Sequence, residues 1–361
     1  MSLVKPHKLK KGDKVAIVSL SGGILGENFA QHQKKLGEKR LRNYGVEPVY
    51  MANTLMGIEY LNKHPEARAA DLKAAFLRDD IQGIFCVIGG DDTYRLLPYL
   101  MDDPEFITAV HNHPKLFSGF SDTTINHLMF YKLGLQTFYG PNFLNDLAEL
   151  DKDLLPYTAN TISNYFKLTT SLKIISSNTW YEERTDFSPD VVGTARVSHT
   201  EKLGYETLNG SGVVITGKLL GGCIDSLNDI LTNTRYSDER EICFKYGIFP
   251  EIKQWQDKIL FIETSEERPT PEEYEVMLGN LEKQGIFKVI NAIIAGKPQN
   301  NVYYQDYREK LKTIAEKYDL PILTNVNFGH AYPRTVIPYG CTAKIDFDKK
   351  EFEITESLFQ E

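Results

Sequence analysis

The sequence predicts an α/β protein of two domains, with a parallel sheet in the first and a larger share of strands in the second. In residues 1–165, short β-branched and aromatic runs alternate with segments of helical periodicity, a pattern typical of βαβ units and a buried parallel sheet. The 361 residues exceed the usual range of a single domain, and with 42% of them hydrophobic the chain can bury at least one large core.

The elements predicted for the first domain alternate along the chain, and we assign this domain to residues 1–167. Functional side chains in such sheets gather where the strands end, at their carboxyl edge. Strands are expected at 14–19, 46–50, 83–89, 114–119 and 136–140, and helices at about 27–44 and 65–79, after Asp122, and near 155–166.

Periodicity fades between about 168 and 195, in a polar and aromatic stretch that contains SSNTWYEERTDFSPD. We interpret this stretch as a linker or a mobile loop. It separates the first domain from a second one at 196–361.

The second half of the chain is richer in strands and is interrupted by two predicted helices. One of these helices begins at Thr270, where TPEE combines a capping box with proline at the first helical position. Strands are expected in VVGTARV (191–197), GVVITGKLLGG (212–222), KILFIET (258–264), VINAIIAGKP (289–298) and PILTNVNFG (321–329), and a hairpin in TAKIDFDKKEFEITES (342–357).

Charge and cysteine content exclude several classes of function. The chain has 41 Lys and Arg against 49 Asp and Glu, a net charge of −8 without a long single-sign block, so no footprint for nucleic acid is present. The four cysteines lie far apart with no CxxC pair, which argues against a zinc ribbon or a disulfide scaffold and fits a reducing cytoplasm. The first apolar run, VAIV (15–18), is too short for a signal segment. We expect a cytoplasmic protein with a small-molecule or peptide partner and no membrane.

The stretch FSGFSDTT (117–124) places Ser121 in a turn between a predicted strand and a predicted helix. A hydroxyl there lies above the sheet edge, beside the free N–H groups and the positive dipole end of the helix, where an oxyanion could be stabilised. By residue type alone, a helix cap at Ser121 or Asp122 is the commoner interpretation. Thr123 replaces the second glycine of G-x-S-x-G, which disfavours ordinary lipase or esterase chemistry.

A serine nucleophile needs a base and a group that orients the base. Of the eight histidines, His330 follows the apolar run 322–328 at a predicted strand end, in NFGHAYPR. Glu263 ends another apolar strand, where an unpaired charge would be costly. The alternatives are a surface histidine in a loop and a glutamate in a buried salt bridge or cap.

These residues resemble a known family. Gly119-Phe-Ser-Asp-Thr123, the strand-end Glu263 and Gly329-His330 are similar to the Ser, Glu and His triad of the LD-carboxypeptidase family, which includes the microcin C immunity peptidases. Further similar motifs follow in the family's order along the chain: LKKGDKV (9–15), IGGDDTYRLLP (88–98), GKLLGGC (217–223) and IPYG (337–340).

The resemblance implies a flavodoxin-like N-terminal domain that carries the serine and a barrel-like, β-rich C-terminal domain that carries Glu263 and His330, with the active site between them. It also implies a cytoplasmic homodimer without metal or cofactor that cleaves amide bonds beside a free carboxylate or in an acyl-nucleotide. The implied oxyanion hole consists of the N–H groups of Asp122 and of the Gly89-Gly90 turn, since glycine lets the backbone approach a ligand closely. A plain tight turn at Gly89-Gly90 is equally compatible with the sequence.

Two departures from the family pattern favour the microcin-immunity branch. Val87-Ile88 stands where muropeptide-trimming members carry an arginine before the Gly-Gly pair, and Cys223 replaces an asparagine after a second Gly-Gly. Trp180, with Tyr181 and Phe187, could stack a nucleobase as in that branch, although aromatic residues in a long loop are as often packed against their own domain.

Other functions stay open on the sequence alone. A muropeptide L,D-carboxypeptidase could use a different arginine, such as Arg95. A non-enzymatic nucleotide binder could use Ser21-Gly22-Gly23 after the first strand, although this loop lacks both the G-x-G-x-x-G order and a P-loop lysine. An immunity protein could also sequester its ligand without turnover.

Overall fold

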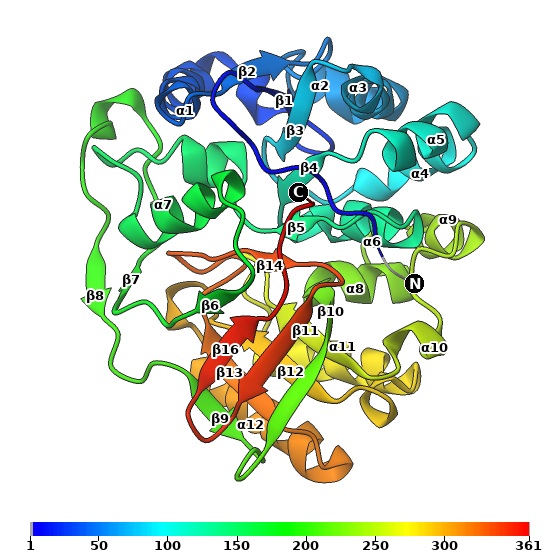
Figure 1. The fold of residues 1–361 in the computed structure, drawn as a ribbon, viewed down its shortest axis with the longest axis vertical. Helices are drawn as coiled ribbons and strands as arrows, with labels where there is room; N and C mark the ends of the chain where they lie inside the picture. Colours follow the sequence, from blue (N-terminus) through cyan, green and yellow to red (C-terminus); the bar gives the residue numbers. More distant parts are fainter. Residues whose placement is uncertain (1–2, 361) are drawn as a thin grey trace.

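A computed structural model of the chain describes residues 3–360 and contains one large sheet in each half of the molecule (Figure 1). The upper sheet has six strands in the order β14-β5-β4-β3-β1-β2, and the lower has eight in the order β6-β16-β15-β10-β11-β12-β13-β9. This arrangement confirms the predicted α/β class, with a parallel N-terminal sheet and a strand-rich C-terminal domain.

Parallel pairing dominates the N-terminal sheet: β2, β1, β3, β4 and β5 are parallel neighbours, and only β14, which comes from the C-terminal half, is antiparallel. The sequence predicts these strands well because helices bury both faces, so that the strands are nearly continuous apolar runs. The strands are β1 Lys14–Val18, β2 Glu47–Tyr50, β3 Ile81–Cys86, β4 Leu116–Gly119, β5 Phe138–Tyr139 and β14 Ile337–Pro338.

Seven α-helices belong to this half of the described chain. α6 follows β4 through a single 3-10 turn, Ser121–Thr123, so the candidate nucleophile lies between the carboxyl end of a strand and the start of a helix. The helices are α1 Gln31–Asn43, α2 Ile58–Lys63, α3 Pro65–Leu77, α4 Leu97–Met101, α5 Pro104–Asn112, α6 Thr124–Lys132 and α7 Pro156–Ser163.

The C-terminal sheet is mixed. Its centre, β10 to β13, is parallel, and four antiparallel pairings flank it, including the predicted hairpin β15–β16. The strands are β6 Leu172–Ile174, β9 Glu206–Leu208, β10 Val214–Cys223, β11 Lys258–Glu263, β12 Ala292–Gly296, β13 Ile322–Val326, β15 Thr342–Asp346 and β16 Glu351–Ile354.

In the described chain, five α-helices connect these strands, rather than the two that were predicted. The capping box predicted at Thr270 is present at the start of α11, with Pro271 in its first turn. The helices are α8 Ile224–Leu231, α9 Glu239–Lys245, α10 Ile252–Trp255, α11 Pro271–Lys283 and α12 Tyr304–Tyr318.

The stretch 168–195 is more structured than its sequence suggests. β6 joins the C-terminal sheet beside β16, and β7 (Thr179–Tyr181) pairs with β8 (Ser198–Thr200) in a separate ribbon. The strand predicted at 191–197 is wrong, because Gly193 turns the chain at φ +85° and the Arg196 side chain enters a buried ion pair with Glu149. The mobility of this stretch stays a prediction.

Side chains from both sheets meet in the middle of the molecule. Tyr139 on β5 contacts Phe261 on β11, with ring centroids 5.7 Å apart, and its hydroxyl donates a hydrogen bond to Glu263. The Thr124 hydroxyl at the start of α6 accepts a hydrogen bond from the N–H of Cys223 at the end of β10. The candidate nucleophile and the candidate acid–base pair are thereby fixed relative to each other.

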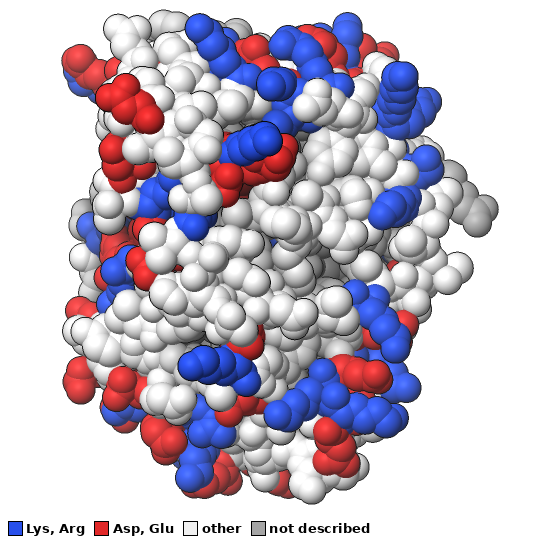
Figure 2. Space-filling view, turned by 90° about the vertical axis from the view of Figure 1, so that its left-hand side faces the viewer, with Lys and Arg blue, Asp and Glu red and all other residues white. Residues whose placement is uncertain are grey.

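On the face shown in Figure 2, positive and negative side chains are interspersed around a broad central area without charged side chains. None of the helices formed by residues 3–360 has the length and apolar character needed to cross a lipid bilayer.

Candidate active site

A cavity of about 450 Å³ lies where the two halves of the chain meet. Gly89, Gly90 and Ser121 line it from the N-terminal domain, and Glu266 and His330 line it from the C-terminal domain. The structure therefore brings together residues that are more than 200 positions apart in the sequence. The cavity is the natural place for a substrate.

Ser121 has a strained backbone. Its φ of +70° is uncommon for a residue other than glycine, and such strain persists only where the surroundings enforce it. Its N–H donates to the Tyr139 hydroxyl at 3.0 Å, which holds the turn in place. No side-chain cap is formed at the start of this turn or of α6, so the interpretation of Ser121 as a helix cap is wrong.

The Gly89-Gly90 turn packs directly against Ser121. A Cβ atom on Gly89 would lie 2.6 Å from the Ser121 Cβ and 2.9 Å from its Oγ. Gly90 has a φ of +144°, which only glycine adopts readily, and a Cβ there would collide with Ser21. Among residues 3–360, none accepts a hydrogen bond from the Gly90 N–H. The turn therefore offers a free backbone donor beside the serine.

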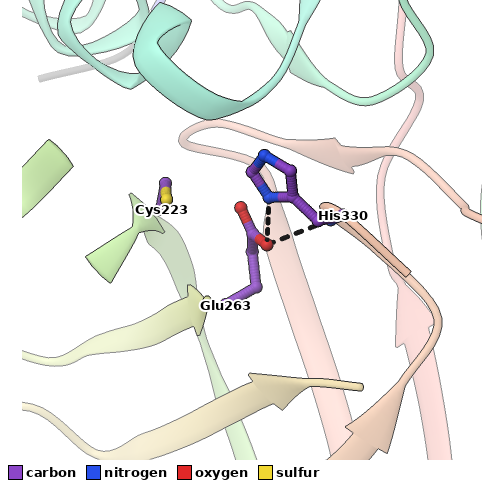
Figure 3. A group of neighbouring side chains, drawn as sticks. All are labelled: Cys223, Glu263 and His330. Atoms are coloured by element: carbon purple, nitrogen blue, oxygen red, sulfur yellow. Dashed lines mark hydrogen bonds and ion pairs between the residues drawn. The ribbon is translucent and has the colours of Figure 1, made fainter. Parts of the chain in front are cut away.

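His330 and Glu263 form a buried pair (Figure 3). Glu263 Oε2 accepts hydrogen bonds from the His330 Nδ1 at 2.8 Å and from its backbone N–H at 3.0 Å. Gly329, at φ +72°, leaves room for the carboxylate, since a Cβ there would overlap it. A carboxylate on Nδ1 fixes the tautomer and leaves Nε2 as the nitrogen that can exchange a proton.

A second carboxylate binds the other ring nitrogen: Glu266 Oε2 lies 2.8 Å from His330 Nε2. Burial lowers the pKa of His330, but the charges of Glu263 and Glu266 outweigh burial and raise this pKa to about 10. Partial desolvation raises the pKa of the Glu266 carboxyl, and the charge of His330 overcomes this and lowers the pKa to about 2. In the free protein, His330 is therefore an imidazolium held between two carboxylates.

Sequence reasoning missed Tyr139, which connects the nucleophile to the carboxylate. Its fully buried hydroxyl donates to Glu263 Oε1 at 2.5 Å and accepts the Ser121 N–H at 3.0 Å. Burial, followed by the charge of Glu263, raises the pKa of Tyr139 well above its ordinary value, so the hydroxyl stays protonated and can donate. No motif could have indicated this role, because the contact joins two domains.

Tyr139→Phe is expected to lower kcat by about tenfold to a hundredfold with little change in KM, since it leaves two buried groups beside the reacting atoms unpartnered, each at about 1–3 kcal/mol. Tyr165→Phe is the matched control, because Tyr165 is equally buried but bonds Ser118, away from the cavity. Steady-state kinetics and thermal unfolding of both variants check this prediction. Equal kinetics for the two variants would contradict it.

Two predicted site residues, Asp122 and Trp180, have side chains that are engaged away from the cavity. The Asp122 carboxylate is buried and accepts the Thr93 N–H at 2.9 Å, so its backbone N–H alone remains for an oxyanion. Burial raises the pKa of this carboxyl to about 7. Trp180 stacks on His199, with centroids 4.1 Å apart, and does not line the cavity, whereas Phe187 from the same stretch does.

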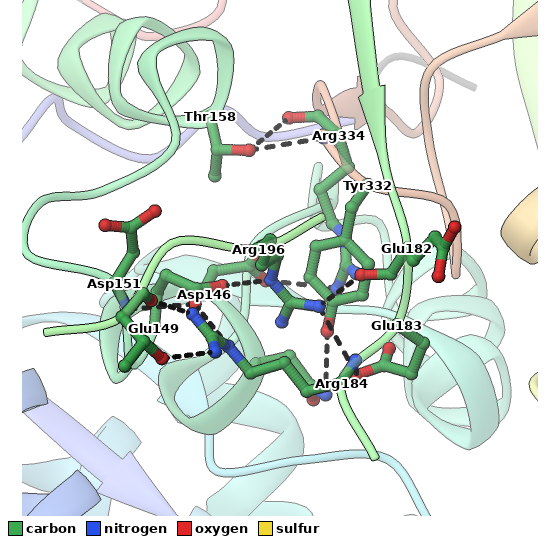
Figure 4. Close-up of polar contacts among 12 residues, drawn as sticks. Asp146, Glu149, Asp151, Thr158, Glu182, Glu183, Arg184, Arg196, Tyr332 and Arg334 are labelled. Carbon is green, nitrogen blue, oxygen red and sulfur yellow. Dashed lines mark hydrogen bonds and ion pairs between the residues drawn. The ribbon is translucent and has the colours of Figure 1, made fainter. Parts of the chain in front are cut away.

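A polar network lies beside the cavity (Figure 4), and Glu183, Tyr332 and Arg334 from it line the cavity. Arg334 is buried, pairs with Asp146 at 3.2 Å, and its guanidinium lies 4.1 Å from the ring centroids of both Phe120 and Tyr332. Phe120 in turn packs edge-on against the His330 ring at 5.0 Å. Arg334 thus supports the ring that flanks the base, a role that a lone arginine in the sequence could not suggest.

The alternative sites raised by the sequence are occupied by internal contacts. Arg95 pairs with Asp92 at 3.2 Å and does not line the cavity. The Ser21 hydroxyl, in the glycine-rich loop after β1, also donates to Asp92, at 2.9 Å. Neither side chain lines the cavity, and each is bound to Asp92.

One group of described residues brings three metal-ligating atoms within 4.8 Å of one another: Cys223, Glu263 and His330 (Figure 3). Burial and the neighbouring carboxylates raise the pKa of the Cys223 thiol well above its ordinary value, so the thiol stays protonated. Glu263 and His330 are already bonded to each other. The group therefore fits a hydrogen-bonded pair beside a thiol better than a preformed metal site.

Comparison with known proteins accounts for this architecture. Residues 15–140 match the LD-carboxypeptidase N-terminal domain, and residues 216–345 match the LD-carboxypeptidase C-terminal domain. The chain is 30% identical to YocD of Bacillus subtilis, named as a carboxypeptidase, over 94% of this chain and 95% of that protein. It is 28% identical to the microcin C7 self-immunity protein MccF of Escherichia coli, over 80% and 78% of the two chains.

A solved structure extends this similarity. The crystal structure of an MccF-like protein from Streptococcus pneumoniae in complex with AMP superimposes with a TM-score of 0.90 at 45% identity, covering 97% of this chain and 99% of that one. The motifs, the fold and these matches agree, and the chain belongs to the LD-carboxypeptidase family of peptidases.

Proposed function

We propose that this protein is a serine peptidase that hydrolyses an amide or acyl bond in a small peptide or in an aminoacyl or peptidyl nucleotide. One observation carries the proposal: Ser121, in a strained turn, shares a cavity with His330, whose Nδ1 is bound by the buried carboxylate of Glu263. These side chains can serve as the nucleophile, the base and the orienting acid of acyl transfer.

In the proposed mechanism, Ser121 Oγ attacks the scissile carbonyl carbon while His330 Nε2 takes the hydroxyl proton. The N–H groups of Asp122 and Gly90 donate to the oxyanion, and the imidazolium then gives its proton to the leaving group. Water hydrolyses the acyl-enzyme by the same steps in reverse. Because Glu266 binds Nε2 and His330 is an imidazolium in the free protein, Glu266 has to leave and the Nε2 proton has to pass to solvent before the first proton transfer.

The lining of the cavity supports a nucleotide conjugate as substrate. Phe187 lines the cavity with an aromatic ring that is 43% exposed, and a base stacked on such a ring contributes about 1–3 kcal/mol. Tyr332 also lines the cavity, but the guanidinium groups of Arg196 and Arg334 already lie over its ring. The Streptococcus pneumoniae relative binds AMP. The residues that precede the Gly-Gly turn, Val87 and Ile88, supply no cation for a terminal carboxylate.

A second candidate, muropeptide L,D-carboxypeptidase activity, is favoured by a different observation. Arg268 lines the cavity, donates to Gln299 Oε1 at 3.2 and 3.1 Å, and forms no ion pair with any described residue. An oriented guanidinium without an acidic partner can bind the carboxylate of a terminal amino acid. The absence of a cofactor or catalytic metal, the homodimer and the cytoplasmic location stay predictions.

We expect aminoacyl sulfamoyl-adenylates to be hydrolysed with a higher kcat/KM than an L,D-tetrapeptide. Mass spectrometry of the products from both incubations tests this directly. A higher kcat/KM for the tetrapeptide would reverse the assignment of substrate, and the triad would stand.

The aromatic contact can be tested separately. Phe187→Ala is expected to raise KM for the adenylate more than it lowers kcat, because stacking remote from the scissile bond is uniform binding. The sequence led us to expect this effect at Trp180, so Trp180→Ala is the matched comparison. A larger KM effect at Trp180 would show that the stretch 168–195 rearranges around the substrate.

A further inference from the structure

The two carboxylates on His330 differ in their surroundings. The Glu263 side chain is fully buried and has further partners, whereas the Glu266 side chain is 58% exposed and pairs with His330 alone among the described residues. Glu263 is thus built into the fold. Glu266 lies three residues further on, in the loop that follows β11. Because its carboxylate is already largely in solvent, it can move away from His330 at little cost in solvation.

Other charged groups also face this pair. Asp225 on α8 is near enough for its charge to interact with His330, and Arg235, in the loop after α8, interacts with Glu266. Arg235 is already bound by Glu267 and Asp229. On the remaining side, the turn after β4 contributes the uncharged Phe120. None of these neighbours contacts His330 Nε2. Among the described residues, the position of Glu266 therefore determines whether Nε2 is free to react.

The proposed substrate carries a group that can take the place of His330 on Glu266. In an aminoacyl compound, the α-ammonium nitrogen lies only about 2.5 Å from the carbonyl carbon, two covalent bonds away. When that carbon lies at Ser121 Oγ, the ammonium is in the same cavity as the Glu266 carboxylate. An ammonium is also the chemical counterpart of the imidazolium that Glu266 binds in the free protein.

We propose that Glu266 recognises the free α-ammonium group of an aminoacyl substrate and occupies His330 Nε2 until that group arrives. Binding of the ammonium and release of His330 then occur in one exchange of ion-pair partner. His330, left with one carboxylate instead of two, passes its Nε2 proton to solvent and becomes the base. A substrate whose amino group is acylated presents a neutral amide and cannot make this exchange. Glu266 is therefore a determinant of specificity for aminoacyl over N-acylated substrates. This inference rests on the proposed function and narrows its substrates from aminoacyl and peptidyl compounds to the aminoacyl ones.

Alanyl sulfamoyl adenosine and its N-acetyl derivative test the proposal, because they differ only at the amino group, which is a charged ammonium in the first and a larger, neutral amide in the second. Binding is measured first in the Ser121→Ala background, where no turnover interferes. The free amine is expected to bind about tenfold more tightly, as a charge-assisted hydrogen bond implies. Glu266→Gln should abolish this preference. The matched control, Glu267→Gln, removes the adjacent exposed carboxylate, which pairs with Arg235 outside the cavity, and should preserve it.

A second readout follows the base itself. Since two carboxylates raise the pKa of His330, removal of one by Glu266→Gln should lower this pKa by about one unit or more. The NMR titration of the His330 ring reports it without activity. In kinetics, the acid limb of kcat/KM, which marks loss of the proton from the base, should move to lower pH in Glu266→Gln and stay in place in Glu267→Gln.

The outcomes separate this inference from the proposed function. Equal binding of the two adenosines, or a preference that survives Glu266→Gln, overturns the role of Glu266 even if both compounds are hydrolysed. If neither compound binds, the proposed role of Glu266 is also overturned. A preference for the amine that is lost in Glu266→Gln supports the role of Glu266, even if the wild-type protein turns neither compound over and the proposed hydrolysis fails.

Discussion

Ser121→Ala and His330→Ala are each expected to lower kcat by roughly 10³-fold or more, because a nucleophile and its base act as one unit and the loss of either removes the whole pathway. The residual rate would come from the backbone donors and from substrate binding, which both variants keep. KM is expected to change little, since neither side chain is required to hold the substrate.

The controls for this prediction use the same residue types elsewhere. His111→Ala, at an exposed position, should retain wild-type kcat. Glu263→Gln should reduce kcat less than either Ala variant, because the amide can still contact Nδ1. Thermal unfolding should show all four variants folded. Turnover near the wild-type rate by purified Ser121→Ala would exclude the proposed mechanism.

Gly89→Ala is expected to lower kcat by about a hundredfold, because a shift of the nucleophile by about 1 Å has an effect of this size. The added methyl group would lie 2.6 Å from the Ser121 Cβ, closer than such atoms approach, so one of the two turns has to move. The backbone of Ser121 cannot shift easily, since its N–H donates a hydrogen bond to the Tyr139 hydroxyl. The strain therefore displaces the oxyanion donors, the hydroxyl, or both.

Gly279→Ala provides the matched substitution. Gly279 lies within α11, and a Cβ there would meet no atom within 4 Å, so alanine should leave kcat unchanged and stabilise the helix by about 0.5–1 kcal/mol. Steady-state kinetics and thermal unfolding of the two Gly→Ala variants check both statements. Full activity in Gly89→Ala would show that the Gly-Gly turn does not constrain the nucleophile.

The parallel strands and the capped helix could be predicted because their signals are local. β1 and β11 are apolar runs of the length that a buried strand needs, and TPEE specifies a helix start through contacts within four residues. The strand wrongly predicted at 191–197 shows the limit of such reasoning. Its β-branched residues suggest a strand, but Arg196 finds a buried partner, Glu149, 47 positions away.

The candidate site was predictable to the extent that its residues lie at strand ends. Ser121, Glu263 and His330 follow three apolar runs, and this placement, with the family motifs, was enough to single them out. Two contacts were not predictable: the Tyr139 hydroxyl, which bridges the Ser121 N–H and Glu263, and the ion pair between Glu266 and His330 Nε2. Each is a contact between side chains from different elements, and it exists only once the two domains have come together.

The structure also changes the pH dependence that the sequence suggests. A histidine beside one carboxylate leads to an expected apparent pKa of roughly 6 to 7 for the base. With Glu266 on the second nitrogen, the pKa of His330 in the free protein is about 10. The acid limb of kcat/KM is therefore expected above the ordinary histidine range, and Glu266→Gln is expected to move it towards that range.

Covalent labelling with a fluorophosphonate, followed by peptide mapping, tests the central claim most directly, because it reports nucleophilic chemistry at one atom without knowledge of the natural substrate. The label is expected on Ser121, and it should be lost in Ser121→Ala and strongly slowed in His330→Ala. Labelling at another residue, or hydrolysis of a substrate by a protein whose Ser121 takes no label, would contradict the assignment of Ser121 as the nucleophile.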